Sequence, residues 1–351
     1  MGRTSGQERR VTAGDKARKG RSLAVPTEYP AHLVDVVARF GVRADRLLSG
    51  SGLSRSTLDA ADPVDPATFS SLIERALALS GEPGLGFYFG LSLKLSSHGL
   101  LGLLAMTSPT LGEALLAAER FMSLRASELT VRLEDVDAER AAMVFRHAAP
   151  ANLQVFFTEA FFVILLQVGR ALLGRPLDAL CEHAYAEPSH FARFAHLLPP
   201  GARFGATENR LIFARALLGQ AVVTSDDVMA RRVERECQAA LAALDQRLSL
   251  VSKVRRDLRM ARGALPSLEQ TAARRGVSER TLKRKLAADG TSYRALVEEL
   301  QRERAVELLR AGDAPVEQVA ASLGYADKAS FHRAFRRWFG TTPAAFRARG
   351  P

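Results

Sequence analysis

Cysteine is scarce in this chain of 351 residues, which contains only Cys181 and Cys237. Two cysteines exclude both the several disulfides of a small secreted scaffold and a four-cysteine zinc site. Histidine offers no alternative metal site, because His183, His190 and His196 follow one another at intervals of seven and six residues. No compact set of metal ligands has that spacing. We therefore expect neither a bound metal nor a cofactor.

Long apolar runs are missing as well. The longest, Ala160–Leu166, has seven residues and is flanked by Glu159 and Gln167, whereas a membrane-spanning helix needs about 20 apolar residues. The basic residues of segment 1–24 are not followed by an apolar stretch, so this segment does not have the pattern of a secretory signal. These absences predict a soluble, cytoplasmic protein with no membrane among its partners.

The sequence also lacks the common catalytic motifs. It contains no G-x-S-x-G nucleophile elbow, no Walker phosphate-binding loop and no H-E-x-x-H metal motif. No residue is therefore a candidate for catalysis, and we do not expect an enzyme.

Positive charge is abundant but unevenly distributed. The whole chain has 49 basic and 38 acidic residues, a net charge of +11. Residues 250–351 contain 21 basic and 11 acidic residues, and residues 1–24 contain seven basic and two acidic residues. The segment between them has a net charge of −4. The C-terminal region is therefore suited to bind a polyanion, and charge alone does not distinguish nucleic acid from an anionic membrane.

Hydrophobic periodicity divides the chain into a tail and two folded parts. Residues 1–24 have no apolar period and are interpreted as a disordered basic tail. Residues 25–224 predict an α+β domain, and residues 225–249 predict a helical connector. Residues 250–351 contain only helical patterns, so we expect an all-α domain there.

Within residues 25–224, helical patterns and strand patterns are mixed. The apolar residues of Leu129–Leu133 and Met143–Phe145 alternate with other residues, which predicts a β-hairpin. Asn152–Leu173 is apolar almost all round, as expected of a helix buried in a core. Two further strands are expected around Cys181–Ala186 and Arg210–Phe213, with a helix near Ser189–Leu198 between them.

The C-terminal region contains an internal repeat. Ser267–Gly276 (SLEQTAARRG) aligns with Pro315–Gly324 (PVEQVAASLG) at an offset of 48 residues. Each copy predicts a short helix that ends at a glycine, which readily adopts the positive φ of a tight turn. A second helix is expected after each turn, over Ser278–Ala288 and Asp327–Phe339. The repeated unit is therefore helix, turn, helix.

Both second helices have a basic outer face, although an ordinary helical bundle with a solvated basic surface is the alternative. Helix-turn-helix units, here 267–288 and 315–339, insert the N-terminal part of the second helix into the DNA major groove. Between them, Tyr293–Leu309 is one uninterrupted helical pattern, about 25 Å long at 1.5 Å per residue. Such a linker helix would hold two reading helices about one DNA turn apart. The expected partner is double-stranded promoter DNA, contacted in two adjacent major grooves.

Three features of this region are found together. They are the repeated E-Q-x-A-A-x-x-G helix, the R-x-x-A-x-x-L-L pattern of Arg302–Leu309, and the closing stretch Gly324–Arg347. With these features, residues 250–349 closely resemble the DNA-binding domain of the AraC/XylS family of bacterial transcription regulators. Many members have an arginine on the linker helix where this chain has Gln301, so no DNA contact is carried over to that position.

The resemblance implies DNA contacts from matching positions of the two second helices. In the first unit these positions are Arg280, Lys283 and Arg284. In the second unit they are Lys328, Ser330, His332 and Arg333, and we add Arg337 because it belongs to the same basic face.

The middle domain resembles the arabinose-binding-type effector domain of one branch of the family, through Gly99–Leu115 and Arg203–Phe213. The resemblance implies a small-molecule effector but does not imply arabinose. Phe121 and Arg125, on the helix predicted to be capped by Thr110, are the candidate effector contacts. An arginine beside an aromatic ring could bind a carboxylate, and a surface salt bridge is the alternative.

The sequence therefore predicts a ligand-responsive, sequence-specific transcription regulator with an effector-binding and dimerisation domain. The resemblance adds activation of transcription, a homodimer and RNA polymerase as a further candidate partner, but the residues do not distinguish activation from repression. The alternative is a constitutive or architectural DNA-binding protein whose middle domain only dimerises.

Overall fold

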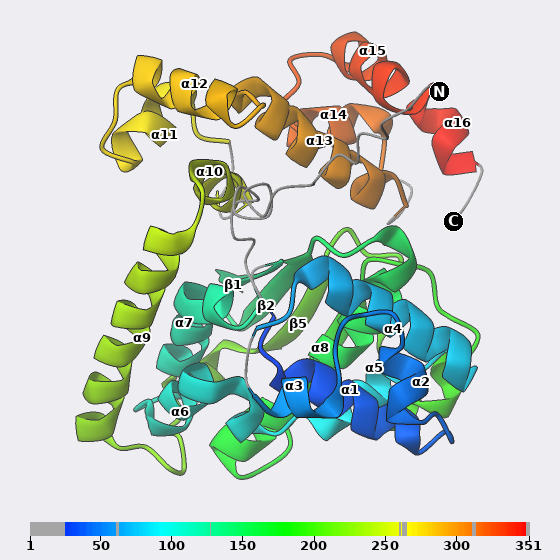
Figure 1. Ribbon diagram of the computed structural model, residues 1–351, viewed down its shortest axis with the longest axis vertical. Helices are drawn as coiled ribbons and strands as arrows, with labels where there is room; N and C mark the ends of the chain where they lie inside the picture. Colours follow the sequence, from blue (N-terminus) through cyan, green and yellow to red (C-terminus); the bar gives the residue numbers. More distant parts are fainter. Residues whose placement is uncertain are drawn as a thin grey trace, which may run out of the picture.

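The computed structural model describes residues 25–60, 63–126, 128–259, 261, 265–310 and 314–348. The predicted basic tail, residues 1–24, lies outside these ranges. Figure 1 shows two folded parts, an N-terminal domain with a β-sheet and a C-terminal part built from helices. A long helix, α9 (Asp227–Arg247), runs along one side of the N-terminal domain and leads to the helical part. The expected fold class, an α+β domain followed by a helical domain, is confirmed.

The N-terminal domain begins with helices and contains all the strands among the described residues. Its α-helices are α1 (Glu28–Ala38), α2 (Ala44–Leu48), α3 (Arg55–Asp59), α4 (Pro66–Ser80), α5 (Leu85–Ser92), α6 (Gly99–Thr107), α7 (Leu111–Phe121) and α8 (Gln154–Leu173). Its strands are β1 (Leu129–Asp135), β2 (Arg140–His147), β3 (Ala179–His183), β4 (Arg203–Phe204) and β5 (Asn209–Ala214). Its short 3-10 helices are η1 (Leu95–His98), η2 (Met122–Leu124), η3 (Ala151–Leu153), η4 (Phe191–Arg193), η5 (Ala195–Leu197) and η6 (Arg215–Gly219).

The five strands form one sheet in the order β1-β2-β5-β3-β4. All neighbouring strands are antiparallel except β3 and β4, which are parallel. The predicted hairpin is confirmed, since Val131 on β1 pairs with Phe145 on β2. One face of the sheet packs on α8, where the ring of Phe145 lies 4.6 Å from that of Phe161 and 4.9 Å from that of Phe162.

Helix α8 separates two hydrophobic cores. Phe162 packs with the sheet, whereas Phe156 and Ala160 pack with residues of α1, α4 and α5. The prediction of a buried core helix is confirmed. Among the described residues, Ala151–Leu173 is also long and apolar enough to cross a membrane, as is the bent pair of α5 with η1 and α6 if counted as one span. However, 56% of the most apolar window of Ala151–Leu173 is buried inside the protein, as is usual for a core helix.

Where the sequence predicts a helix, near Ser189–Leu198, the structure has two short 3-10 helices, η4 and η5. A 3-10 helix has three residues per turn, so side chains three apart project from the same side. Phe191 and Phe194 have that spacing, and both are buried. Phe194 stacks on Phe87 with 4.7 Å between ring centroids. The strands expected on either side are present as β3 and β5.

Helix α9 packs on the N-terminal domain. Its residues Val233 and Cys237 are buried against Leu101 of α6 and Phe121 of α7. After a short break, α10 (Leu250–Arg259) turns away into the C-terminal part. The connector is therefore held against one part of the molecule over much of its length.

The C-terminal part contains every helix that the repeat predicts. Its helices after α10 are α11 (Leu268–Arg274), α12 (Glu279–Ala288), α13 (Tyr293–Arg310), α14 (Val316–Ser322), α15 (Lys328–Phe339) and α16 (Pro343–Ala348). The linker helix α13 ends one residue beyond its predicted end.

The two helical units have separate hydrophobic cores. Buried residues of the first core are Val254, Leu258, Ala272, Leu282, Leu286, Leu296 and Leu300. Buried residues of the second core are Ala305, Leu309, Val319, Ala320, Leu323, Phe331 and Phe335. Helix α13 contributes its first half to the first core and its second half to the second. It is therefore a structural member of both units.

Candidate nucleic-acid interface

Glycine turns and polar N-caps set the geometry of both helical pairs. Gly276 follows α11 with a φ of 62°, and Gly324 follows α14 with a φ of 81°. The second helices then begin at capping side chains. Ser278 Oγ accepts a hydrogen bond from the backbone N–H of Thr281 at 3.2 Å, and Asp327 Oδ1 accepts one from that of Ser330 at 2.6 Å. The predicted turns and caps are confirmed.

Small and large buried side chains hold the helices of each unit together. Ala272 of α11 and Ala320 of α14 are buried at the two crossings. In the first unit Leu282 and Leu286 of α12 are completely buried, and in the second Phe331 and Phe335 of α15 are. These pairs fix which side of each second helix faces inward, and the opposite side is left for solvent or a ligand.

The outward side of α12 is basic and largely unpaired. Arg280, Lys283 and Arg284 are exposed. Lys283 lies 3.7 Å from the carboxylate of Glu279 one turn earlier, a contact of little energetic value at the surface. Arg280 and Arg284 have no hydrogen-bond or ion-pair partner among the described residues. Their guanidinium groups are therefore free to contact phosphates or bases.

At the start of α15, the candidate residues form a local polar network. Arg333 Nη2 donates to Ser330 Oγ at 3.0 Å, and Ser330 Oγ donates to Asp327 Oδ2 at 3.0 Å. The hydrogen bonds from Ser330 lower the pKa of Asp327. Lys328 is exposed and paired with Glu317 of α14. The network positions Arg333, which is itself exposed, on the outward side of the helix.

His332 and Arg337 are placed differently from the other candidates. His332 is half-buried, and its Nε2 has no hydrogen-bond partner among the described residues. Arg337 Nη2 donates to Glu298 Oε1 of α13 at 2.6 Å, and Trp338 Nε1 donates to the same oxygen at 2.6 Å. These two hydrogen bonds, that of Trp338 first, lower the pKa of Glu298. Arg337 thus fastens α15 to the linker helix.

Gln301 stands where many members of the AraC/XylS family have an arginine, and here its side chain makes hydrogen bonds within the protein. Its Nε2 donates to the backbone oxygen of Leu323 at 2.9 Å, and its Oε1 accepts from the hydroxyl of Tyr325 at 3.3 Å. Both partners flank Gly324. The side chain therefore holds the turn of the second unit against α13.

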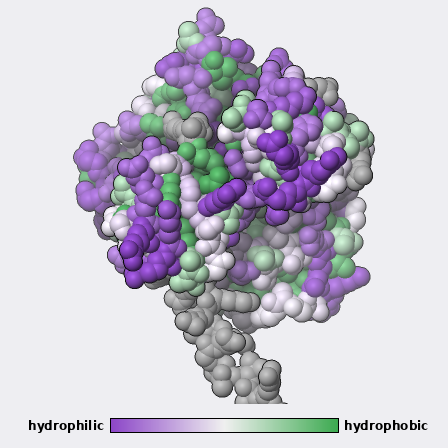
Figure 2. Space-filling view, turned by 90° about the horizontal axis from the view of Figure 1, so that it is seen from above, coloured by the Kyte–Doolittle hydropathy of each residue, from purple (hydrophilic) through white to green (hydrophobic). Residues whose placement is uncertain are grey.

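The two second helices lie on the same side of the C-terminal part. In Figure 1, α12 and α15 are at opposite ends of α13, on the side that faces away from the β-sheet domain. Figure 2 looks down on that side and shows hydrophilic residues over most of it, with smaller apolar areas between them. With about 27 Å of helix in α13, the structure presents two separated basic surfaces in one direction.

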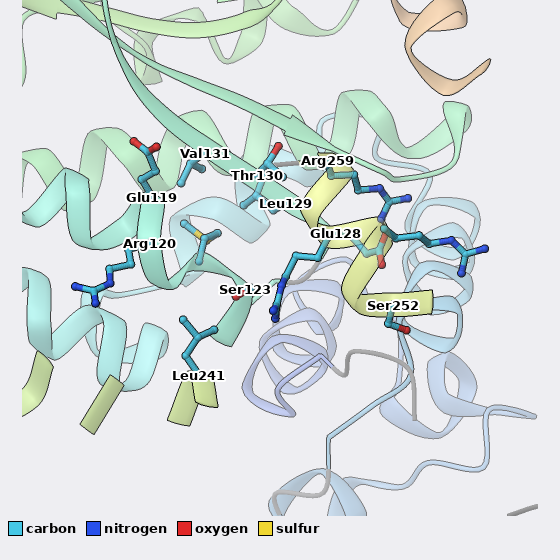
Figure 3. A pocket seen from close by; sticks show the side chains of 13 residues that line it. Glu119, Arg120, Ser123, Glu128, Leu129, Thr130, Val131, Leu241, Ser252 and Arg259 are labelled. Atoms are coloured by element: carbon cyan, nitrogen blue, oxygen red, sulfur yellow. The ribbon is translucent and has the colours of Figure 1, made fainter. Parts of the chain in front are cut away.

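A small pocket of about 230 Å³ lies between the two parts of the molecule, lined by α7, β1 and α10 (Figure 3). In it, Arg259 of α10 points toward Glu128, and Arg259 Nη1 donates to Glu128 Oε2 at 3.0 Å. Nearby, Arg255 Nη2 of α10 donates to Glu299 Oε2 of α13 at 2.9 Å. The contact between Arg259 and Glu128 was not predicted from the sequence, because 131 residues separate them and neither belongs to a motif.

A larger cavity, about 560 Å³, lies inside the N-terminal domain and is lined by α4, α6, α7 and α8. Arg125 lines this cavity, but Phe121 does not. Helix α7 ends at Phe121, which is buried against α9, and Arg125 follows the short helix η2. The two candidate effector residues are therefore not brought together. Arg125 is not a surface residue either, since its side chain is only 12% exposed.

Comparison with known proteins identifies both parts. The family described as the arabinose-binding domain of AraC transcription regulators matches residues 41–222, and a helix-turn-helix domain family matches residues 271–349. The ornithine utilization regulator of Pseudomonas aeruginosa is 32% identical over 327 residues, which are 92% of this chain and 96% of that protein. The regulator VirS of Mycobacterium tuberculosis is 26% identical over 81% of this chain and 84% of its own.

A solved structure, the transcriptional regulator CdpR of Pseudomonas aeruginosa, covers 90% of this chain and 97% of its own at 22% identity, with a TM-score of 0.42. The matched families span both folded parts in the order that the structure shows. The chain therefore belongs to the AraC family of transcription regulators, with an arabinose-binding-type N-terminal domain and a C-terminal helix-turn-helix DNA-binding domain, and it is not an enzyme.

Proposed function

We propose that this protein reads a specific DNA sequence with α12 and α15 in two adjacent major grooves and responds to a small molecule bound in its N-terminal domain. The observation that carries the proposal is the pair of capped, basic second helices on one side of a shared linker helix. Arginine and lysine at the start of such helices bind guanine edges and phosphates. The DNA contacts are assigned to Arg280, Lys283, Arg284 and Arg333, with Lys328, Ser330 and His332 beside them.

Arg337 takes a smaller part in the proposal. Its hydrogen bond to Glu298 directs it toward α13, so we assign it a phosphate contact at most. The remaining parts rest on the family: a homodimer formed through the N-terminal domain, activation through RNA polymerase, and a cytoplasmic location.

The test of DNA binding uses the full chain and a pool of random duplexes. Repeated selection should enrich a sequence with two half-motifs about one turn apart. Affinity for that sequence should fall with salt, by about 0.9 in log K per unit of log salt for each phosphate neutralised. Absence of enrichment, a flat salt response, or tighter binding to anionic vesicles would contradict the proposal.

The second candidate function is a constitutive or architectural DNA-binding protein. The 560 Å³ cavity favours a sensor, because ligand pockets typically have about 300–1,000 Å³ and are lined mainly by apolar side chains. A constitutive protein would show DNA affinity and a melting temperature that no small molecule changes. A sensor's melting temperature rises with its ligand.

A further inference from the structure

The walls of the N-terminal cavity are almost entirely apolar. Helix α8 contributes Phe157, Phe161 and Ile164, and α7 contributes Leu115 and Ala118. A ligand that fills such a space gains affinity by removing apolar surface from water. The main body of the ligand is therefore apolar.

One end of the cavity is polar and positively charged. The hydroxyl of Tyr29 lies 3.1 Å from Nδ1 of His98, and the guanidinium carbon of Arg125 lies 5.2 Å from the centre of the Tyr29 ring. Arg125 Nη2 donates to the backbone oxygen of Ser97 at 2.8 Å. The three side chains come from α1, the end of η1 and the segment after η2, so sequence reasoning could not group them.

This polar end has hydrogen-bonding atoms that are buried but unused. Arg125 Nε and His98 Nε2 have no hydrogen-bond partner among the described residues. The carboxylate nearest to Arg125 is that of Glu28, at 3.6 Å, and this carboxylate is 49% exposed. A buried guanidinium N–H without a partner is costly. These two atoms therefore have no hydrogen-bond acceptor among the described residues.

The protonation states of Tyr29 and His98 follow from their burial. Burial raises the pKa of Tyr29, so its hydroxyl keeps its proton at neutral pH and shares a hydrogen bond with Nδ1 of His98. Burial, and then the charge of Arg125, lower the pKa of His98 to about 4. His98 is therefore neutral, and its Nε2 is a donor in the tautomer in which Nδ1 accepts from Tyr29. Arg125 Nε is a donor in either case, so at least one donor of this group has no acceptor among the described residues.

We propose that this cavity binds an organic monocarboxylate with an apolar body, whose carboxylate is held by Arg125 and His98. The inference rests on the proposed function and specifies the chemical class of its effector. A carboxylate has two acceptor oxygens and matches an arginine well. Gly99 makes room for the guanidinium, since a Cβ there would lie 3.0 Å from Arg125 Nη1.

Other ligand classes fit this cavity less well. A sugar would bury several hydroxyl groups against apolar walls without partners, which costs free energy for each group. A dibasic amino acid would need free acidic residues. Of the two glutamates that line the cavity, Glu128 is paired with Arg259 at 3.0 Å, which leaves only Glu74, an acceptor from the neutral amide of Asn152 at 2.8 Å, for two ammonium groups. The name of the matched family therefore does not predict the ligand here.

The experiment is calorimetric titration of the full chain with butanoate, octanoate, decanoate and phenylacetate, each below its micellar concentration. Octanol, L-arabinose and L-ornithine serve as comparison compounds. We expect the longer carboxylates to bind more tightly than butanoate, and octanoate to bind at least about tenfold more tightly than octanol, since one charge-assisted hydrogen bond is worth about 1.5–3 kcal/mol. Equal affinity for octanol, no binding of any carboxylate, or preferred binding of arabinose or ornithine would overturn the inference.

Two variants locate the site. Arg125→Gln should weaken octanoate binding at least about tenfold, while the matched control Arg120→Gln should not. Arg120 also lies over an aromatic ring, that of Phe121 at 5.0 Å, but does not line the cavity. Ala118→Phe leaves the polar end intact and fills the cavity, so it should abolish binding. If octanoate binding survives both changes, the site is elsewhere and the inference is wrong.

DNA binding by the same proteins separates this inference from the proposed function. Without added carboxylate, the Arg125→Gln and Ala118→Phe variants should still bind the selected duplex. This binding also shows that their helical units are folded. If the carboxylates fail while the wild-type chain binds DNA specifically, only the ligand class is wrong. If the chain does not bind DNA specifically at all, the proposed regulator function fails.

Discussion

The guanidinium of Arg259 and the carboxylate of Glu128 lie 3.0 Å apart, across the boundary between the N-terminal domain and the helical part. Glu128 immediately precedes β1 and lines the large cavity as well as the small pocket between the domains. Arg259 also lies 3.4 Å from Glu303 of the linker helix α13. The contacts from the cavity to the linker helix are therefore continuous.

This relationship predicts that Glu128→Gln weakens the coupling between effector and DNA. The variant should retain DNA affinity in the absence of effector, because Glu128 is not on the DNA-binding surface. The effector-induced change in DNA affinity should decrease about two- to fivefold, since a partly exposed ion pair contributes about 0.2–1 kcal/mol. The measurement is DNA affinity with and without octanoate. The control is Glu134→Gln, because Glu134 pairs with Arg132 inside the N-terminal domain; an equal loss in both variants would contradict the prediction.

Arg284→Ala and Arg333→Ala should change sequence preference as well as affinity. Each substitution should reduce the free energy of binding to the selected duplex by about 1–3 kcal/mol and relax the preference at particular base pairs. Selection from random duplexes, repeated with each variant, measures this. Arg274→Ala is the control, because Arg274 is exposed on the first helix of its unit. Uniformly weaker binding of all sequences would identify the changed residue as a phosphate contact.

The spacing of the two half-motifs should be fixed. Five added base pairs rotate one half-motif by about half a turn, to the far side of the duplex. Because α13 is part of both hydrophobic cores, the second unit cannot follow this rotation. Affinity should fall toward non-specific values of about 10⁻⁴–10⁻⁶ M. Retained affinity for the lengthened site, measured by fluorescence anisotropy, would show that the units are flexibly joined.

Gly324→Val should destabilise the second unit. Gly324 has a φ of 81°, although a Cβ there would meet no atom within 4 Å. The cost is therefore one of backbone strain, about 1–2 kcal/mol for a left-handed residue. Gly324→Asn should cost less, because asparagine tolerates this conformation. Urea unfolding followed by the fluorescence of Trp338 tests the difference, and equal stability of the two variants would show that the turn can relax.

The N-terminal domain should lose stability in mild acid. His183 is completely buried, and burial lowers its pKa to about 3. As the pH falls below about 6.5, the unfolded chain binds a proton at this residue and the folded chain does not, so stability falls until the pH reaches the folded pKa. Between pH 7 and pH 5 the loss from this residue is about 2 kcal/mol.

His183→Phe should reduce this loss, since phenylalanine does not titrate and can keep the ring stacking on Phe204, now 4.4 Å away. The measurement is the free energy of unfolding in urea at pH 7 and pH 5. The exposed His196 supplies the control, His196→Asn. The prediction fails if His183→Phe and the wild type lose stability equally on acidification.

The helical part was predictable from the sequence because its determinants are local. These determinants are the repeat, the glycines at 276 and 324, and the caps Ser278 and Asp327. Each affects only residues a few positions away in the chain. A helix was predicted near η4 and η5, but not its 3-10 type, because Phe191 and Phe194 are placed by tertiary packing on Phe87 and its neighbours. The same reason applies to the cavity. Its polar end joins Tyr29, His98 and Arg125, which no periodicity relates.

One consequence of the shared helix α13 concerns how such a protein changes its target. Inserting one residue into α13 would turn one unit by about 100° relative to the other and move it by about 1.5 Å. Seven inserted residues would nearly restore the phase and lengthen the helix by about 10 Å, or about three base pairs. The distance between half-motifs is thus encoded in the length of one helix. This distance can change only by helix lengthenings that keep both second helices facing the DNA, so both the repeat of the α-helix and the repeat of DNA limit it.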